Sequence, residues 1–190
     1  MRGSLYAALG CACLGLAGFA FAAPAPVAPA CRDLQGRIVR PLDTSGAQAV
    51  LLIFVAKDCP ISNSYSPEIN RLAVYCRANG VRMELVDIDS AASVADIARH
   101  ARDYGYVCPV VLDRDHKLAH TVGATVTPEA VLLDSRGNIA YRGRIDDRYL
   151  DFGKVRQVAR VHDLRDAIAA VLAGTRPSHP RTKAVGCFIS

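Results

Sequence analysis

The feature that most constrains the fold is an unbroken apolar segment, residues 49–55, which is followed four residues later by a Cys-Pro pair. The segment reads Ala-Val-Leu-Leu-Ile-Phe-Val, the pattern of a strand buried on both faces in the middle of a parallel sheet. Pro60 fits the first turn of a following helix, where its missing N–H leaves no hydrogen bond unmade. The sequence therefore predicts that Cys59 lies at the N-terminus of the first core helix.

This position favours a reactive thiol at Cys59. The unpaired N–H groups and the positive end of the dipole at a helix start stabilise a thiolate, which lowers the pKa of a cysteine. Lys57, two residues earlier, is expected to add a positive charge. The alternative is a small buried apolar residue, as free cysteines often are. We favour the nucleophile because of the helix-start position.

The rest of the chain predicts an α/β fold. Strands are expected at residues 81–88, 108–112, 130–134 and 139–144, with a short hairpin within residues 34–42. Helices are expected from residue 60 to about 79, at 93–104 and at 161–173, with a helical turn at 116–122 and a polar connection at 146–160. Parallel strands joined by helices and followed by an antiparallel pair form a mixed central sheet with helices on both faces.

The N-terminal segment predicts export. A basic start precedes an uncharged apolar run that closes with Ala20-Phe21-Ala22, a small-x-small cleavage pattern. An uncleaved membrane anchor is the alternative, because the run is about as long as a bilayer requires. We expect cleavage, a periplasmic or secreted protein, and no stable membrane insertion afterwards. The expected organisation is a signal peptide at 1–22, a Pro/Ala-rich linker at 23–31, one domain at 32–174 and a tail at 175–190.

Charge and histidine spacing give little support for other classes of function. The net charge of +5 is scattered, without a basic stripe, so no nucleic-acid partner is expected. His116 and His120 lie four residues apart, but two histidines in a polar turn are usually solvated rather than metal-bound. Two aspartate pairs lack the full spacing of a calcium loop and suit turns better. These pairs are Asp113 with Asp115 and Asp146 with Asp147. We expect neither a cofactor nor a bound metal.

The segment 54–67, Phe-Val-Ala-Lys-Asp-Cys-Pro-Ile-Ser-Asn-Ser-Tyr-Ser-Pro, resembles the active-site segment of the thioredoxin-like superfamily. Its Cys-Pro pair is most similar to the redoxin, or AhpC/TSA, branch that is related to peroxiredoxins. Thr127-Pro128 resembles the cis-proline element of that family, which implies that Thr127 lies beside Cys59. The stretches 143–147 and 183–189 resemble an exported redoxin subgroup. The resemblance implies a thioredoxin-like fold and thiol-dependent redox chemistry.

The segment also departs from the best-known active sites of the superfamily. A Cys-x-x-Cys dithiol needs a second cysteine where Ser62 stands, and a copper-delivering Cys-x-x-x-Cys needs one at Asn63. A typical peroxiredoxin has threonine or serine three residues before the cysteine, where this chain has Ala56. A partner thiol for Cys59 must therefore come from elsewhere in the chain.

Cys187 is the candidate partner. Export implies an oxidising compartment, and five of the seven cysteines remain once residues 1–22 are removed. The segment 174–187 can span roughly 40 Å when extended, and Gly186 permits a close backbone approach. We expect the tail to dock. A structural disulfide from Cys187 to Cys31 or another cysteine stays open, and Cys76 and Cys108 are expected to be a structural pair or simply buried.

The leading hypothesis is an exported thiol–disulfide oxidoreductase in which Cys59 attacks and Cys187 resolves. Thr127 and Pro128 would line the site, and Asn63 with the helix amides would stabilise negative charge. The partners would be a protein thiol or disulfide, or a peroxide, and an external reductant. The alternatives are a thiol peroxidase of the AhpC/TSA type, a Sco-like copper-binding module and a catalytically silent binding domain.

Overall fold

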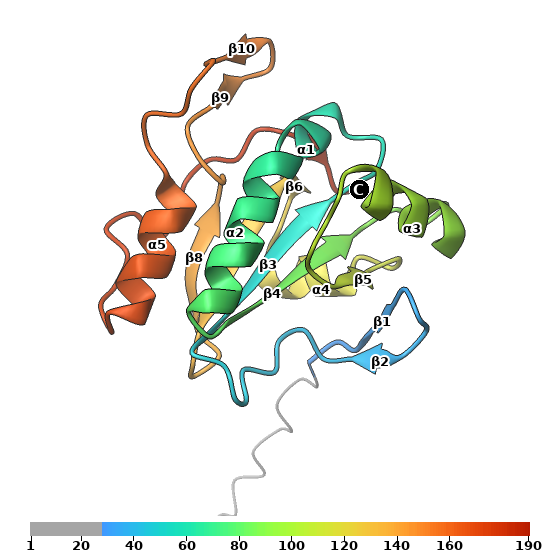
Figure 1. Cartoon of the computed structure of the whole chain (residues 1–190), viewed down its shortest axis with the longest axis horizontal. Coiled ribbons are helices and arrows are strands. Elements are labelled where there is room, and N and C mark those ends of the chain that lie inside the picture. The colour runs from blue at the N-terminus through green and yellow to red at the C-terminus, as the bar shows by residue number, and fades with distance from the viewer. Residues whose placement is uncertain (1–27) are drawn as a thin grey trace, which may run out of the picture.

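A computed structural model describes residues 28–190 of the chain (Figure 1). The expected signal peptide, and all of the expected linker but its last residues, lie outside this part. The described residues form a seven-stranded sheet in the order β2-β1-β5-β4-β3-β7-β8. The strands of this sheet are β1 (Cys31–Asp33), β2 (Ile38–Val39), β3 (Ala49–Val55), β4 (Val81–Asp87), β5 (Val110–Leu112), β7 (Glu129–Asp134) and β8 (Ile139–Gly143).

The sheet is mixed, as the sequence predicted. The central strands β3, β4 and β5 run parallel, whereas β7 and β8 continue the sheet in antiparallel fashion on one side and β1 and β2 on the other. All seven residues of β3 are buried, which explains its purely apolar sequence. The fold is therefore α/β with a thioredoxin-like arrangement of the central strands.

Helices cover both faces of the sheet because side chains of β3 alternate between two cores. Leu51 and Ile53 pack with residues of α2, α3 and α5, whereas Leu52 and Phe54 pack with residues of α4. In Figure 1, α2 crosses in front of β3 and β4, and α4 and β6 lie behind them. The helices are α1 (Pro60–Ser64), α2 (Ser66–Ala78), α3 (Val94–Asp103), α4 (Lys117–Val122) and α5 (Asp163–Leu172).

The helix expected from residue 60 to 79 is two helices, α1 and α2, with Tyr65 between them. Pro67 has no N–H to donate to the carbonyl of Asn63, so the helical ladder is interrupted there. The N–H of Tyr65 instead bonds the carbonyl of Ser62 at 3.0 Å. The break leaves α1 as a separate turn that carries only the first residues after Cys59.

Three further boundaries differ from the sequence prediction. The first strand already begins at Cys31, within the expected linker, and pairs there with Val39. Cys108 lies before β5 rather than in it, because the carbonyl of Pro109 accepts from Leu85 but its nitrogen cannot donate. The connection 146–160 contains a small hairpin of β9 (Tyr149–Asp151) and β10 (Lys154–Val155). Such short strands carry no readable periodicity.

The tail, residues 175–190, docks on the domain, as expected. Thr182 donates its N–H to the carbonyl of Arg142 at 3.1 Å, so the tail first runs beside β8. It then forms β11 (Cys187–Phe188), which pairs antiparallel with β6 (Val126–Thr127). The labelled C-terminus lies at the end of the sheet where α1 begins (Figure 1). Within residues 28–190, no helix has the length and apolar character needed to cross a bilayer.

Candidate active site

Cys59 lies at the predicted place, as the N-cap of α1 directly after the central strand. Its sulfur accepts a hydrogen bond from the N–H of Ser62 at 3.4 Å, which ties the side chain to the first turn of the helix. The thiol donates to the carbonyl oxygen of Thr127 at 3.0 Å. Cys59 is 1% exposed, so solvent barely reaches it in this conformation.

Thr127 and Pro128 form the second wall of the site. Their peptide bond is cis, as the resemblance implied. Thr127 ends β6 and is fully buried, and its carbonyl faces the thiol of Cys59. The structure thus brings Cys59 together with Thr127 and Pro128, although Cys59 and Thr127 lie 68 residues apart in the sequence.

The docked tail forms the third wall and brings Cys187 to the site. Cys187 stands opposite Thr127 in the β11–β6 pairing. A side chain at Gly186 would overlap the carbonyl oxygen of Thr127, so only glycine allows this approach. Cys187 packs against the core cluster that contains Cys59, and it stands next to the residue whose carbonyl accepts the Cys59 thiol. Both thiols are free in this structure.

The surroundings give the two thiols opposite acidities. Burial raises the pKa of Cys59, but hydrogen bonds from Cys187 and Ser62 outweigh it and lower the pKa to about 7. Burial and the contact with Cys59 raise the pKa of Cys187 to about 11. Near neutral pH, Cys59 is therefore the more readily ionised thiol of the pair.

Ser62 is a site residue that the sequence argument missed. In the sequence it marks only the position where a Cys-x-x-Cys motif would have its second cysteine. The residue is fully buried, and its hydroxyl oxygen has no other partner among the described residues, yet it helps to lower the pKa of Cys59. A buried hydroxyl without a partner is costly unless it finds an acceptor, and a thiolate at Cys59 supplies one. Its position in the first helical turn was the available signal.

Asn63 does not face the sulfur, which differs from the expected role. Its Nδ2 donates to the carbonyl of Lys57 at 2.8 Å, and its Oδ1 lies 2.8 Å from Nε2 of His100. Both functional groups of the amide are therefore occupied by the loop before Cys59 and by α3. The ammonium of Lys57 pairs with Asp58 at 2.5 Å, so its charge is also directed to a neighbouring carboxylate. Asn63 and Lys57 support the loop and not the thiolate.

The other three cysteines lie apart from this site. Cys31 is on β1, Cys76 is on α2 and Cys108 precedes β5, and all three are free thiols. Burial raises the pKa of each thiol, to about 12 for Cys31 and Cys76 and to about 11 for Cys108. Among the cysteines of residues 28–190, only Cys59 has a lowered pKa.

His116 and the aspartates considered as metal ligands have structural partners. The ring of His116 bonds the carbonyl of Ile88 at 2.8 Å. The carboxylate of Asp113 accepts the N–H groups of Leu118 and Ala119 at the start of α4. Asp146 and Asp147 accept backbone N–H groups of the following loop. The part of the chain that the structure describes holds no group of three or more His, Cys, Asp or Glu suited to a metal ion.

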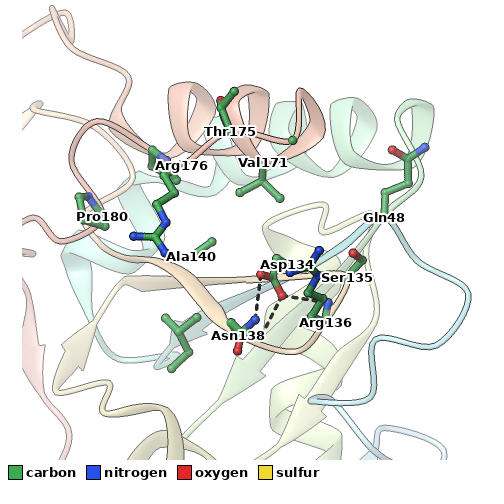
Figure 2. Close-up of a pocket in the computed structure, with 13 residues that line it drawn as sticks. Gln48, Asp134, Ser135, Arg136, Asn138, Ala140, Val171, Thr175, Arg176 and Pro180 are labelled. Carbon is green, nitrogen blue, oxygen red and sulfur yellow. Dashed lines mark hydrogen bonds between the residues drawn. The ribbon is translucent and has the colours of Figure 1, made fainter.

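A pocket of about 700 Å³ opens at the other end of β7, away from Cys59. The β7–β8 turn and the start of the tail line it, and Figure 2 shows Arg136, Arg176 and the hydrogen-bonded Asp134 and Asn138 around it. Pro128 precedes β7 whereas Asp134 ends it, so the length of the strand separates this pocket from the thiols. No cysteine lines the pocket.

The fold and the site define a thioredoxin-like protein with one acidic thiol at a helix start beside a cis-proline. More particularly, the chain belongs to the AhpC/TSA family, whose sequence profile matches residues 20–142. The thiol-disulfide oxidoreductase ResA of Bacillus thuringiensis (strain Al Hakam) is 26% identical over 107 residues. That match spans 56% of this chain and 60% of the length of the relative.

Two solved structures share the fold over most of both chains. A hypothetical protein from Sinorhizobium meliloti 1021 has a TM-score of 0.75 at 22% identity, covering 84% of this chain and 88% of that one. An uncharacterized conserved protein from Geobacillus kaustophilus has a TM-score of 0.75 at 24% identity, covering 86% and 89%. Both similarities extend well beyond the matched segment of the family profile.

Proposed function

We propose that this protein is a thiol–disulfide oxidoreductase in which Cys59 attacks and Cys187 resolves. The observation that carries the proposal is the placement of Cys187 on a docked strand opposite Thr127, the residue whose carbonyl accepts the thiol of a Cys59 with a pKa lowered to about 7. The name of the relative that matches over 107 residues, a thiol-disulfide oxidoreductase, supports the same class of reaction.

In this mechanism the Cys59 thiolate attacks one sulfur of a substrate disulfide. A bond forms between Cys59 and that sulfur, and the other substrate sulfur leaves as a thiolate. The Cys187 thiol, after losing its proton, attacks the Cys59 sulfur and releases the second substrate thiol. The substrate disulfide is thereby reduced, the Cys59–Cys187 disulfide is formed, and an external dithiol restores the two thiols.

The first step requires the tail to move, because Cys59 is 1% exposed beneath it. In the reduced protein only non-covalent contacts hold β11 on β6, so movement breaks no covalent bond. Departure of the tail frees the edge of β6, and with it Thr127 and Pro128, for the backbone of an extended substrate. Ser62 stabilises the thiolate, and Asn63 holds the loop that precedes it.

A reductase assay with a disulfide-bonded protein such as insulin, in the presence of a dithiol, tests this function. We expect that with Cys59→Ser the insulin is reduced no faster than by the dithiol alone. With Cys187→Ser we expect a mixed disulfide between Cys59 and the substrate to accumulate. Cys108→Ser is the matched control, since Cys108 lies outside the site, and it should retain activity. Full activity of Cys59→Ser would disprove the mechanism.

A peroxidase reaction is the second candidate, favoured by the near-complete burial of Cys59. Hydrogen peroxide is small enough to reach a thiolate that a docked tail hides from a protein. The thiolate would cleave the O–O bond to give a sulfenic acid and water, and Cys187 would displace a second water to form the disulfide. The apolar Ala56 before the site offers no hydroxyl to orient the peroxide. Peroxide consumption by wild type and Cys59→Ser, measured without a disulfide substrate, separates the two candidates.

Export to the periplasm or the cell exterior is part of the proposal. Its support is the apolar N-terminal segment with its small-residue cleavage pattern, together with a site that depends on disulfide exchange. Expression of the full chain followed by N-terminal analysis of the recovered protein tests it. A start close to Ala23 in the exported fraction supports cleavage, whereas a retained Met1 in the membrane fraction indicates an anchor.

A further inference from the structure

The two sulfurs of the site differ in their access to solvent. Cys59 is 1% exposed and lies below the tail, whereas Cys187 is only partly buried and sits on the outermost strand of the site. The next residue, Phe188, is 79% exposed, so β11 lies at the molecular surface. An approaching thiol therefore meets the sulfur of Cys187 before that of Cys59.

A disulfide between these residues would keep this asymmetry. The covalent bond would hold β11 on β6, and the movement that uncovers Cys59 in the reduced protein would no longer be available. Thiol–disulfide exchange requires the attacking thiolate to approach along the S–S axis, opposite the leaving sulfur, and depends on access. Cys187 is partly exposed on a surface strand, whereas Cys59 is buried at the start of α1, so access favours attack on Cys187.

The chemistry of the leaving group points the same way. Attack on Cys187 releases Cys59, whose sulfur accepts the N–H of Ser62 at the start of α1, whereas attack on Cys59 releases Cys187, which lies on a short strand and not at a helix start. The more acidic thiol is the better leaving group. The N–H of Ser62 is already placed to receive the Cys59 thiolate as it forms.

We infer that the reductant that regenerates this protein, a dithiol, attacks Cys187 and not Cys59. The inference rests on the proposed function, because it concerns the disulfide that the proposed cycle forms. The protein would thus use two thiols in separate tasks: Cys59 receives the oxidised substrate, and Cys187 is the point at which electrons enter.

Reduction by the dithiol takes two exchange steps. The first thiolate of the dithiol bonds to the sulfur of Cys187, the Cys59–Cys187 bond breaks, and its electron pair stays on Cys59. The second thiolate of the dithiol then attacks the dithiol's own bonded sulfur, and Cys187 leaves as a thiolate that takes up a proton. The dithiol ends as a disulfide, and the protein ends with two reduced cysteines.

The test uses a monothiol, glutathione, so that the reaction stops at the first mixed disulfide. The full-length protein is oxidised to the Cys59–Cys187 disulfide, mixed briefly with glutathione, quenched in acid, alkylated and mapped by mass spectrometry. Adducts are followed over a time series and extrapolated to zero time, because later transfer between the two sulfurs scrambles the label. We expect glutathione on Cys187 in at least tenfold excess over Cys59, with the alkylating agent on Cys59.

Two tail variants test whether the docking of the tail determines the preference of glutathione for Cys187. Gly186→Ala should loosen the tail, because the added methyl overlaps the carbonyl of Thr127, and the preference for Cys187 should then fall. Phe188→Ala is the matched control, since its ring is exposed, and it should keep the preference. If Gly186→Ala does not fold, the wild-type ratio still decides the question.

The outcomes separate this inference from the proposed function. Initial adducts on Cys59 in equal or greater amount would overturn the inference while leaving the Cys59–Cys187 cycle intact. They would mean that the tail opens even in the disulfide form. A protein that forms no Cys59–Cys187 disulfide on oxidation would refute the proposed resolving step and this inference with it.

Discussion

Gly186 lies directly against the carbonyl of Thr127, the same carbonyl that accepts the hydrogen bond of the Cys59 thiol. The tail therefore approaches the backbone of the candidate active site too closely at residue 186 for a side chain to fit. Because the carbonyl leaves no room for a methyl group, the identity of residue 186 determines how tightly Cys187 is held beside Cys59.

Gly186→Ala should slow formation of the Cys59–Cys187 disulfide by about tenfold, through a lower effective concentration of the tail thiol at the site. The measurement is the rate of disulfide formation with a mild oxidant such as diamide, followed by peptide mapping. Phe188→Ala should form the disulfide at the wild-type rate. An unchanged rate in Gly186→Ala would show that the contact with Thr127 does not govern the approach of the two thiols.

The acidity of Cys59 should depend on its neighbour. In the reduced wild-type protein, ultraviolet absorbance of the thiolate should rise with a midpoint near pH 7. Cys187→Ala removes a hydrogen bond to the Cys59 sulfur, so the midpoint should move upward, toward the ordinary value of 9.0. Cys108→Ala should leave the midpoint in place. A midpoint that does not move in Cys187→Ala would mean that the tail thiol contributes nothing to the acidity.

Asp87 should make stability depend on pH. It is 1% exposed at the end of β4, and burial raises the pKa of its carboxyl from 3.8 to about 7. The folded state then binds this proton more tightly than the unfolded state, so its contribution to stability is complete below pH 3.8 and is lost as pH rises through 7.

Asp87→Asn removes this titration while keeping an oxygen that accepts the N–H of Asp89. Above pH 7 we expect the variant to be more stable than wild type by about 2 to 4 kcal/mol, and at low pH to differ little. Urea unfolding at pH 5 and pH 8 measures the difference. An equal effect at both values would assign the change to packing and not to titration.

Thr182 should anchor the middle of the tail. Its hydroxyl oxygen accepts the N–H of Arg144 at 3.1 Å and lies 2.6 Å from the hydroxyl of Tyr141. Thr182→Val leaves the N–H of Arg144 without this acceptor, so the free energy of unfolding should fall by about 1 to 2 kcal/mol. Thr121→Val is the control, because its hydroxyl bonds an exposed helical carbonyl. Equal losses in the two variants would argue against a special anchoring role.

The parts of the site that follow from local pattern were predictable. The apolar run of β3 and the Cys-Pro pair place Cys59 at a helix start, because both strand burial and helix entry depend on neighbouring residues. The docking of the tail was predictable in kind, since a Gly-Cys-Phe-Ile ending is unusual for a solvated segment. The register of β11 against β6 was not predictable, because the pairing of Cys187 with Thr127 depends on the whole path of the tail along β8.

The partners of Asn63 illustrate what sequence could not supply. The amide bonds His100, which is 37 residues away on α3, so its direction depends on how that helix packs. The same is true of Ser62, whose hydroxyl is meaningful only once its burial beside the sulfur is known. In both cases the residue stands out in the sequence, but its structural role depends on helices and strands that are far away along the chain.

The course of the tail along β8 has a consequence for solubility. β8 is the last strand of the sheet, and the segment that includes Pro180 and Thr182 bonds part of its free edge through Arg142. An uncovered edge strand is a template for pairing with other chains. The segment that delivers Cys187 to the thiol site thus also shields the molecule from edge-to-edge self-association. Truncation before Arg176 would then produce a chain that aggregates as well as one that lacks its second thiol.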